Sequence, residues 1–321
     1  MWARQLVVWI FVFVVLAPAP GAAFSQSFPN KPIRMVTSEA GGGSDITLRL
    51  IAPGLIAGLG QQVVVDNRPT GVIPMEIVAR APADGYTLLA YGASVWLLPF
   101  MQDSLPYDPI ADFSPIAVTT SAPSIIVVNP SLPVKSIREL IDLAKARPGE
   151  LNYGSAGPGS ITQIATELFK AMAGINIVHI PYRGSAPALN DLLGGQLQLI
   201  FSTAGAVAPH IKSGKLRALA VTSAQPSSLL PGLPTVAAAG LPGYEWETIS
   251  GMFAPRKTPT IIIRRLNQEI VRVLGREDIK QKFFSIGLDT PGSSPEALAA
   301  TMKSDMAVLG KVIRNAGIRA K

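Results

Sequence analysis

The chain has 321 residues, of which 28 are Lys or Arg and 21 are Asp or Glu, giving a formal net charge of +7 at pH 7. The basic residues are scattered singly or in pairs, so neither a basic arm nor a basic stripe with interleaved aromatics indicates a nucleic-acid partner. The lack of cysteine excludes thiol catalysis and thiolate metal sites, and the two histidines, His179 and His210, leave few candidates for a metal ligand or a catalytic base. We therefore expect neither a metal ion nor a cofactor.

The N-terminal segment, residues 1–25, has the pattern of a secretory signal peptide. Arg4 lies in a short leading stretch, an uninterrupted apolar run covers residues 6–17 (LVVWIFVFVVLA), and prolines and small residues follow. The run is shorter than the stretch of about 20 apolar residues that spans a bilayer. The pattern predicts export with cleavage between Ala23 and Gln26, and an uncleaved membrane anchor is the alternative.

After this segment, short apolar strands alternate with amphipathic helices, which is typical of α/β domains with largely parallel sheets. We expect strands over residues 33–37, 63–66 and 87–91, and helices from the glycines at 41–43 to about residue 59 and over residues 76–81. A long apolar stretch at residues 116–129 then leads to Ser136 and Glu139, whose spacing predicts a helix-opening capping box.

The alternation continues to the end of the chain. The further strands are expected at 151–154, 175–180, 197–201, 216–221 and 249–254, and the further helices at 136–147, 160–173, 187–193, 207–212, 260–274 and 295–316, the last opened by Ser293 with Glu296. Residues 226–243, rich in Gly and Pro, form a connector. We predict two lobes, residues 26–123 with 249–321 and residues 124–248, with a cleft where the carboxyl ends of the strands meet.

The first loop that suggests a binding site covers residues 39–45, between a strand and a helix. Three glycines let backbone amides approach a ligand, and the following helix N-terminus favours negative charge. Ile46 stands where a dinucleotide fingerprint needs its third glycine, and no Gly-Lys-Ser/Thr follows as in a P-loop. Asp45 is also suited to cap the helix, so ligand contact and a tight structural turn both remain open.

The second such loop covers residues 155–160. It lacks the Gly-x-Ser-x-Gly of a nucleophile elbow, which favours binding over serine catalysis. His179 lies in an apolar run and is interpreted as a core or edge histidine rather than a base, and His210 as exposed. Arg183 could pair with a carboxylate or remain a solvated surface residue.

Ordered motifs extend over the whole mature chain. They include residues 28–34 (FPNKPIR), 41–45 (GGGSD), 66–69 (DNRP), 83–88 (ADGYTL), 107–109 (YDP), 151–157 (LNYGSAG), 179–184 (HIPYRG), 192–196 (LLGGQ), 215–219 (KLRAL), 233–236 (LPTV) and 240–244 (GLPGY). The series resembles the tripartite tricarboxylate transporter receptor family, also called the Bug family of periplasmic solute-binding proteins.

The resemblance implies a periplasmic, monomeric receptor with a type II Venus-flytrap fold, in which the chain crosses twice between lobes. It implies no catalysis, and a ligand, often a carboxylate, held by backbone amides and hydroxyls. The implied binding residues are Ser38, Glu39, Gly42, Gly43, Ser44, Asp45, Gly92, Ser94 and Trp96 in one lobe, and Ser155, Gly157, Gly159, Ser160, Tyr182, Arg183, Ser202 and Thr203 in the other. The implied partners are membrane transporter subunits or a sensor kinase.

Several positions depart from the family pattern. Glu39 replaces an aromatic or apolar residue, Gln163 stands where His is frequent, Ser202 and Thr203 stand where Asp is common, and two loops are shorter. Trp96 adds a large indole beside the implied pocket. If Glu39 faces the cleft, it would repel a dicarboxylate by about 1 to 4 kcal/mol at 4 Å and favour a ligand with an amine or several donors. The alternative is that Glu39 points to solvent or caps the adjacent helix.

We therefore predict an exported receptor that closes over a small organic solute, with at least one carboxylate, and delivers it to a membrane transporter. An extracytoplasmic sensor subunit would use the same fold and is the first alternative. An exported hydrolase or isomerase that uses residues 155–160 is the second.

Overall fold

The computed structural model describes residues 28–41, 43–69, 71–227 and 230–319. The predicted signal peptide and its cleavage site lie outside these residues. Within them, no helix is long and apolar enough to cross a membrane.

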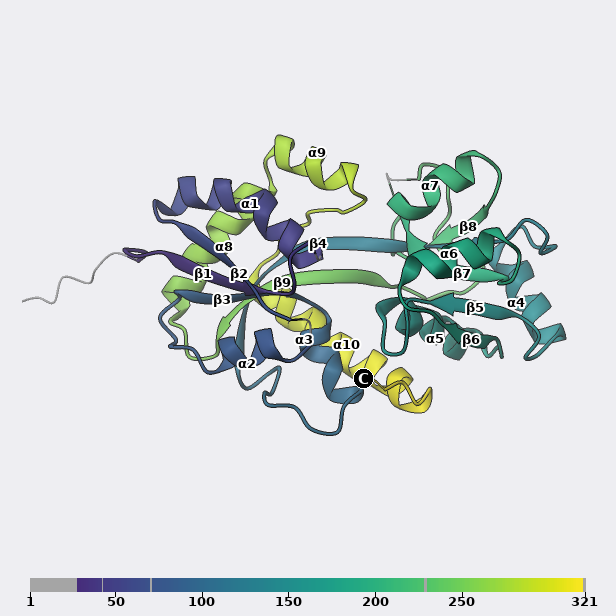
Figure 1. Cartoon of the computed structure of the whole chain (residues 1–321), viewed down its shortest axis with the longest axis horizontal. Coiled ribbons are helices and arrows are strands. Elements are labelled where there is room, and N and C mark those ends of the chain that lie inside the picture. Colours follow the sequence, from purple (N-terminus) through teal and green to yellow (C-terminus); the bar gives the residue numbers. More distant parts are fainter. Residues whose placement is uncertain (1–27, 42, 70, 228–229, 320–321) are drawn as a thin grey trace, which may run out of the picture.

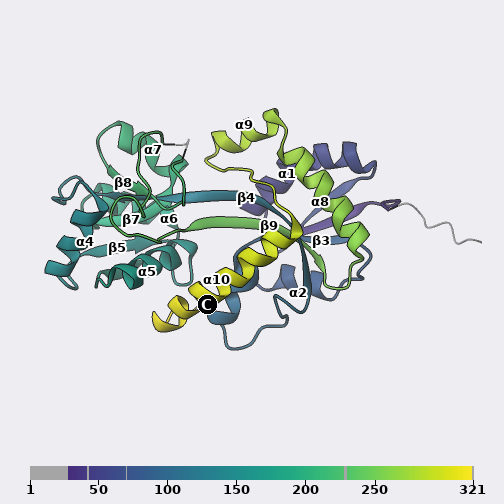
Figure 2. The same ribbon diagram turned by 180° about the vertical axis from the view of Figure 1, so that it is seen from behind.

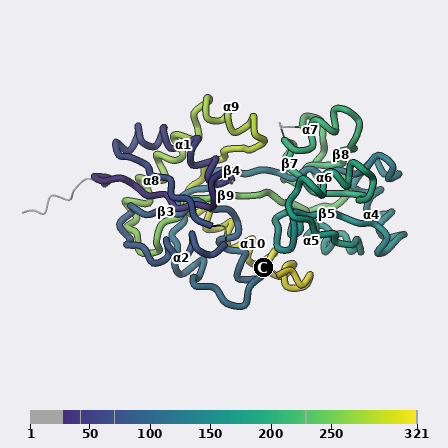
Figure 3. Tube along the Cα trace, in the orientation of Figure 1, coloured from purple at the N-terminus to yellow at the C-terminus, as the bar shows by residue number. Residues whose placement is uncertain are grey.

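Two lobes lie side by side and are joined by two long strands, β4 (Phe113–Val128) and β9 (Glu247–Pro255), as Figure 1 shows. The two strands pair antiparallel from Phe113 to Pro123, and β4 then continues into the second lobe. The chain enters lobe 2 along β4 and returns along β9 (Figure 3). This arrangement confirms the two-lobed α/β fold with two crossovers.

Lobe 1 is built on the sheet order β2-β1-β3-β9-β4. Its other strands are β1 (Ile33–Thr37), β2 (Val63–Asn67) and β3 (Thr87–Gly92), which are parallel to one another, whereas β9 is antiparallel to β3. One face packs against α1 (Gly43–Leu59), α8 (Thr260–Leu274) and α9 (Glu277–Ser285). The other face packs against α2 (Ile73–Ala79), α3 (Ser94–Leu97), the 3-10 helix η1 (Leu98–Phe100) and α10 (Pro295–Asn315).

Lobe 2 uses the far end of β4 as its central strand, in the order β4-β7-β5-β6 with β8 on the other side of β4. Its strands are β5 (Asn152–Ser155), β6 (Val178–Pro181), β7 (Leu199–Thr203) and β8 (Arg217–Val221). Ile125 and Val127 face α6 (Ser185–Leu193) and α7 (Ala204–Lys212), and Ile126 and Val128 face α4 (Ile137–Ala146) and α5 (Ile161–Ala173). The period of two is that of a strand buried on both faces.

Helix α10 connects the cores of the two lobes. Its buried residues Leu298, Met302, Leu309 and Ile313 follow helical spacing, and the helix packs on β4, α3 and α5. In the reverse view it lies in front and runs diagonally below the two joining strands, from lobe 1 toward lobe 2 (Figure 2). One apolar cluster therefore continues from lobe 1 into lobe 2 on this side of the molecule.

The capping box at Ser136 is confirmed in its first half, because Ser136 Oγ accepts from the Glu139 amide at 3.2 Å. The Glu139 carboxylate accepts from the Lys135 amide at 2.8 Å, one residue earlier than predicted. Helix α10 starts at Pro295 as expected, but its N-cap is Ser294 rather than Ser293, because Ser293 Oγ accepts from the Val118 amide at 2.9 Å.

One expectation about the elements was wrong, and two helices were missed. The sheet is mixed rather than largely parallel, because both joining strands run antiparallel to their neighbours. Helix α9 was not predicted, since only Ile279 and Phe283 in it are buried, which is too few for a clear apolar face. The four-residue helix α3 was missed as well.

Candidate ligand-binding site

The strand register brings the carboxyl ends of both half-sheets to the middle of β4. Gly92, at the end of β3, pairs with Ser250, which pairs with Thr120 of β4; Thr203, at the end of β7, pairs with Ser124. The two edges are therefore four residue steps apart along β4, about 13 Å at about 3.3 Å per residue. The loops after β1 and β3 form one wall, the lobe 1 wall, and those after β5, β6 and β7 form the opposite lobe 2 wall.

The first loop of the lobe 1 wall is held from beneath by Asp45. This side chain is 2% exposed, and its oxygens accept from the Gly41 amide at 2.8 Å, Asn67 Nδ2 at 2.8 Å and Arg49 Nε at 2.9 Å. Asn67 Nδ2 also donates to the Ser38 carbonyl at 2.8 Å. Burial alone would raise the pKa of the Asp45 carboxyl, but these hydrogen bonds bring it below its usual value. Asp45 thus supports the loop and does not face a ligand.

The surface of this loop carries Glu39, Gly43 and Ser44. Glu39 and Gly43 are exposed, Ser44 is half-buried, and α1 begins at Gly43. In the described part of the chain, the Glu39 carboxylate has no hydrogen bond or ion pair. Gly42, also expected to contact a ligand, lies outside the described residues.

Tyr91 is a neighbour of Glu39 that the sequence did not reveal. Its hydroxyl accepts from the Gly71 amide at 3.3 Å, and the ring is 6% exposed on β3. Burial raises the pKa of this phenol and the nearby Glu39 charge raises it further. Glu39 therefore lies close to the edge formed by β1 and β3.

Trp96 is not on the wall where the sequence placed it. The indole is fully buried on α3, 6.2 Å from the Phe253 ring, and Nε1 donates to Asp305 on α10 at 2.9 Å. Burial raises the pKa of the Asp305 carboxyl to about 6. The helix that begins at Ser94 turns the indole away from the strand edge, and only Gly92 and Ser94 remain half-buried there.

The main loop of the lobe 2 wall contains a directed chain of hydrogen bonds. The Gly159 amide donates to Gln163 Oε1 at 2.8 Å, so the Gln163 NH₂ group faces His179 Nδ1 at 3.2 Å. Nδ1 must accept this bond, which leaves the ring proton on Nε2, 2.6 Å from Ser155 Oγ. His179 therefore donates to Ser155, whereas a catalytic base would accept from its serine.

The next segment is tied to this loop by backbone contacts. The Tyr182 amide donates to the Ser155 carbonyl at 3.1 Å, and the Gly184 amide to the Ala156 carbonyl at 3.0 Å. Gly157 has φ +133°, and a Cβ there would lie 3.0 Å from the Tyr182 carbonyl, so this position requires glycine.

The remaining residues of the lobe 2 wall differ in their exposure and in whether the protein already binds their polar groups. The Tyr182 hydroxyl donates to Asp191 at 2.6 Å, and burial together with that carboxylate raises the pKa of the phenol to about 12. Ser202 is 6% exposed. Arg183 is exposed and has no ion pair in the described residues, and Thr203 is exposed at the start of α7 without capping it.

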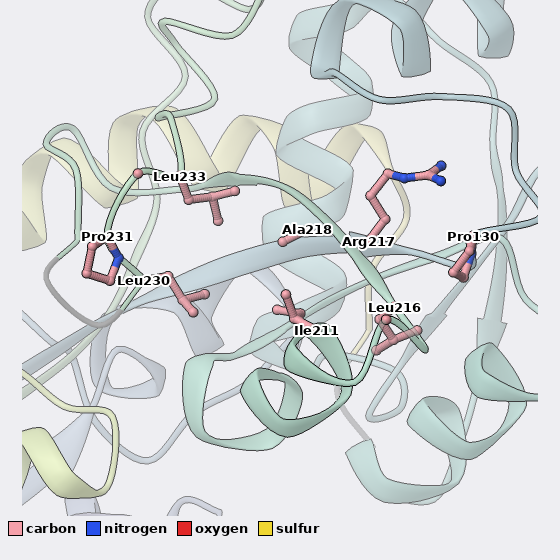
Figure 4. A pocket seen from close by; sticks show the side chains of 10 residues that line it. Pro130, Ile211, Leu216, Arg217, Ala218, Leu230, Pro231 and Leu233 are labelled. Atoms are coloured by element: carbon pink, nitrogen blue, oxygen red, sulfur yellow. The ribbon is translucent and has the colours of Figure 1, made fainter.

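A cavity of about 600 Å³ lies elsewhere in lobe 2 and is shown in Figure 4. Its lining is largely apolar, with Ile211, Leu216 and Leu230 among its residues. Arg217, its charged residue, donates to the Val134 carbonyl at 2.8 Å. None of the residues expected to bind ligand lines this cavity.

The structure thus sorts the expected residues into three groups. Ser38, Glu39, Gly43, Ser44, Gly92, Ser94, Gly159, Ser160, Arg183 and Thr203 have exposed or partly exposed surface at the facing edges. Asp45, Ser155, Gly157, Tyr182 and Ser202 lie beneath them or are engaged by the protein, and Trp96 is in the core. The sequence did not reveal that Gln163 and His179 support the loop at residues 155–160. The β5–β6 register, which pairs Tyr153 with His179, is what places His179 beneath this loop.

Comparison with known proteins points to one family of receptors. The tripartite tricarboxylate transporter family receptor pattern matches residues 47–318. A UPF0065 protein encoded in the tcbD-tcbE intergenic region of a Pseudomonas species is 37% identical over 284 residues, covering 87% of this chain and 84% of its own. Protein BugT of Bordetella pertussis is 34% identical over 322 residues, covering 99% of both chains.

Several solved structures are similar to this chain over most of its length. Rpa4515 of R. palustris with adipate is 38% identical with a TM-score of 0.74, covering 91% of this chain and 99% of that one. A TctC solute binding protein from Polaromonas is 26% identical with a TM-score of 0.81, covering 90% and 100%. MatC from Rhodopseudomonas palustris with bound malate is 28% identical with a TM-score of 0.69, covering 89% and 100%.

Proposed function

The chain belongs to the tripartite tricarboxylate transporter receptor family and is a periplasmic-type solute-binding receptor, and on that premise we propose that it captures a small carboxylate between its lobes. The observation that carries the proposal is the strand register, which directs the carboxyl ends of both half-sheets toward each other across about 13 Å of β4. The adipate-bound and malate-bound relatives support a carboxylate as the ligand class.

Backbone amides supply the proposed anion contacts. The N-terminus of α1 at Gly43 and Ser44, that of α5 after Ser160 and that of α7 after Thr203 all start at the facing edges. Helix N-termini carry partial positive charge and free N–H groups, which favour carboxylates. In our proposal, residues 26–123 with 249–321 and residues 124–248 close as two bodies about β4 and β9.

Two charged residues of the walls, Glu39 and Arg183, have no ion pair among the described residues and indicate which groups the ligand carries at its ends. Arg183 on the lobe 2 wall suits a carboxylate, and Glu39 on the lobe 1 wall suits a group that donates hydrogen bonds. We therefore expect a ligand with a carboxylate at one end and an ammonium or several donors at the other.

A matched ligand pair tests this expectation. Adipate and 6-aminohexanoate differ only in carrying a carboxylate or an ammonium at one end, so their affinity ratio reports the charge that faces that end. Calorimetry should show that Glu39→Gln shifts the ratio toward adipate by about thirtyfold. The shift corresponds to about 2 kcal/mol, because about 1 kcal/mol of repulsion from the carboxylate and about 1 kcal/mol of attraction to the ammonium are lost together for charges 4 Å apart in water.

The control is Glu150→Gln, an exposed substitution in lobe 2 that should leave the ratio unchanged. An unchanged ratio in Glu39→Gln would place Glu39 outside the site. If neither these compounds nor malate stabilises the folded protein in a thermal-shift screen, the carboxylate proposal is wrong.

Delivery to membrane transporter subunits completes the proposal, with a sensor partner as the alternative that binding data alone do not separate. We propose that the protein acts as a monomer after cleavage between Ala23 and Gln26. N-terminal sequencing of the exported protein tests the cleavage, and a start at Met1 would contradict it.

A further inference from the structure

The hydrogen bonds beneath residues 155–160 form a ring that begins and ends on the same loop. Gly159 and Ser155 belong to the loop, while Gln163 lies on α5 and His179 on β6. Ser155 is 2% exposed and Gln163 is 8% exposed, so water competes little for either group. The ring has one direction, from the Gly159 amide through Gln163 and His179 to Ser155 Oγ, because each group is in its only compatible donor or acceptor role.

We propose that His179 is a positioning residue for ligand binding. In its neutral form, with the proton on Nε2, it holds the loop in the shape that presents its amides to the ligand. When His179 takes a second proton, the loop is released and affinity for ligand falls. The affinity part rests on the proposed function, whereas the effect on the loop does not.

Protonation of His179 breaks this ring of hydrogen bonds at one defined contact. A proton on Nδ1 would face the Gln163 NH₂ group at 3.2 Å, placing two donors against each other. Rotating the Gln163 amide restores that contact, but it removes Oε1 from the Gly159 amide and leaves this donor without an acceptor. The disturbance therefore reaches Gly159 and the adjacent Ser160, which caps α5 at the proposed site.

The surroundings of His179 determine where the change occurs. The imidazole of His179 stacks on the Tyr153 ring, with the two ring centroids 4.9 Å apart. Glu167 on α5 accepts from the Tyr153 hydroxyl at 2.6 Å and from Lys170 Nζ at 2.8 Å. Burial lowers the pKa of His179, while the charge of Glu167 raises it and that of Lys170 lowers it. The loop should be held at neutral pH and released at mildly acidic pH.

The first test needs no ligand. Imidazole nitrogen NMR should identify His179 as the Nε2–H tautomer at pH 7.5, with His210→Asn used to assign the signals. On acidification, the amide signals of residues 155–160 should shift with the same midpoint as His179. An Nδ1–H tautomer, or loop amides that do not follow the histidine, would overturn the proposal.

The second test measures adipate affinity by calorimetry at pH 7.5 and 5.0. The side chain of His179→Gln reaches the Nε2 position but takes up no proton in this pH range, so this variant should lose the pH dependence of the affinity. The shorter side chain of His179→Asn cannot reach Ser155 and should lose about fivefold, the worth of one hydrogen bond. His210→Asn should behave as wild type.

Equal pH dependence in His179→Gln and wild type would contradict the proposal. If adipate binds at neither pH, adipate is not a ligand of this receptor, and the tautomer and the loop shifts alone decide the role of His179.

Discussion

The two walls of the proposed site are both held from beneath by a buried polar side chain, but the chemistry of the support differs. In lobe 1, the Asp45 carboxylate accepts from Gly41, Asn67 and Arg49. In lobe 2, Ser155 is held by an uncharged ring that includes His179. One support is a carboxylate whose pKa is lowered by its hydrogen bonds, whereas the other contains a histidine whose pKa is lowered by burial.

The difference means that one loop is held rigidly and the other can change its conformation with pH. Hydrogen bonds to a charged acceptor are stronger than those between neutral groups, so the lobe 1 loop should be the stiffer one. A neutral ring costs less to rearrange, so the lobe 2 loop can respond to conditions. The receptor thus combines a constant wall with an adjustable one.

The largest effect is expected on removing the charged support. Asp45→Ala leaves the Gly41 amide and Asn67 Nδ2 without acceptors and should lower the free energy of unfolding by about 3 kcal/mol. Urea denaturation measures this loss. Asp142→Ala, at an exposed position of α4, is the matched control and should change stability by less than about 0.5 kcal/mol. Equal stability of the two variants would show that Asp45 is not a support.

A smaller effect is expected in lobe 2. Ser155→Ala leaves the His179 Nε2–H and the Gly157 amide without their acceptor, which is a neutral hydroxyl rather than a carboxylate, and should lower the free energy of unfolding by about 1 to 2 kcal/mol. The exposed Ser104→Ala serves as control in the same urea titrations. A loss as large as that of Asp45→Ala would remove the contrast between the two walls.

The smallest effect is the pH dependence of stability. The pKa of His179 is lower in the folded protein than its usual 6.5, so the unfolded chain takes up the proton first as pH falls. The contribution of His179 to stability is therefore fully present above about pH 7 and is lost progressively as the pH falls below its ordinary pKa of 6.5. His179→Gln should remove this decline. Asp45 adds to the loss of stability only below about pH 4, because its pKa is also lowered in the folded state and its carboxylate stays ionised above that pH. The same decline in both proteins would exclude His179 as its cause.

Much of the fold was predictable because it depends on local pattern. The Gly174 C-cap, with φ 61°, and the helix from Thr260 to Leu274 agree with their sequence signals. The positions of the glycine-rich loops between strand and helix were predicted for the same reason. Helix α9 and the turn of α3 were missed, since their stability comes from the neighbours they pack against rather than from a periodic pattern.

The sequence by itself determined the alternation of strands and helices, the two long joining strands and the motifs of the receptor family, because apolar periodicity and turn residues act over short distances. Only the tertiary structure decided that Trp96 is core, that Asp45 supports rather than binds, and that Ser155 receives a hydrogen bond from His179. These roles depend on the register between strands far apart in the chain, and a register is set by packing across the whole sheet.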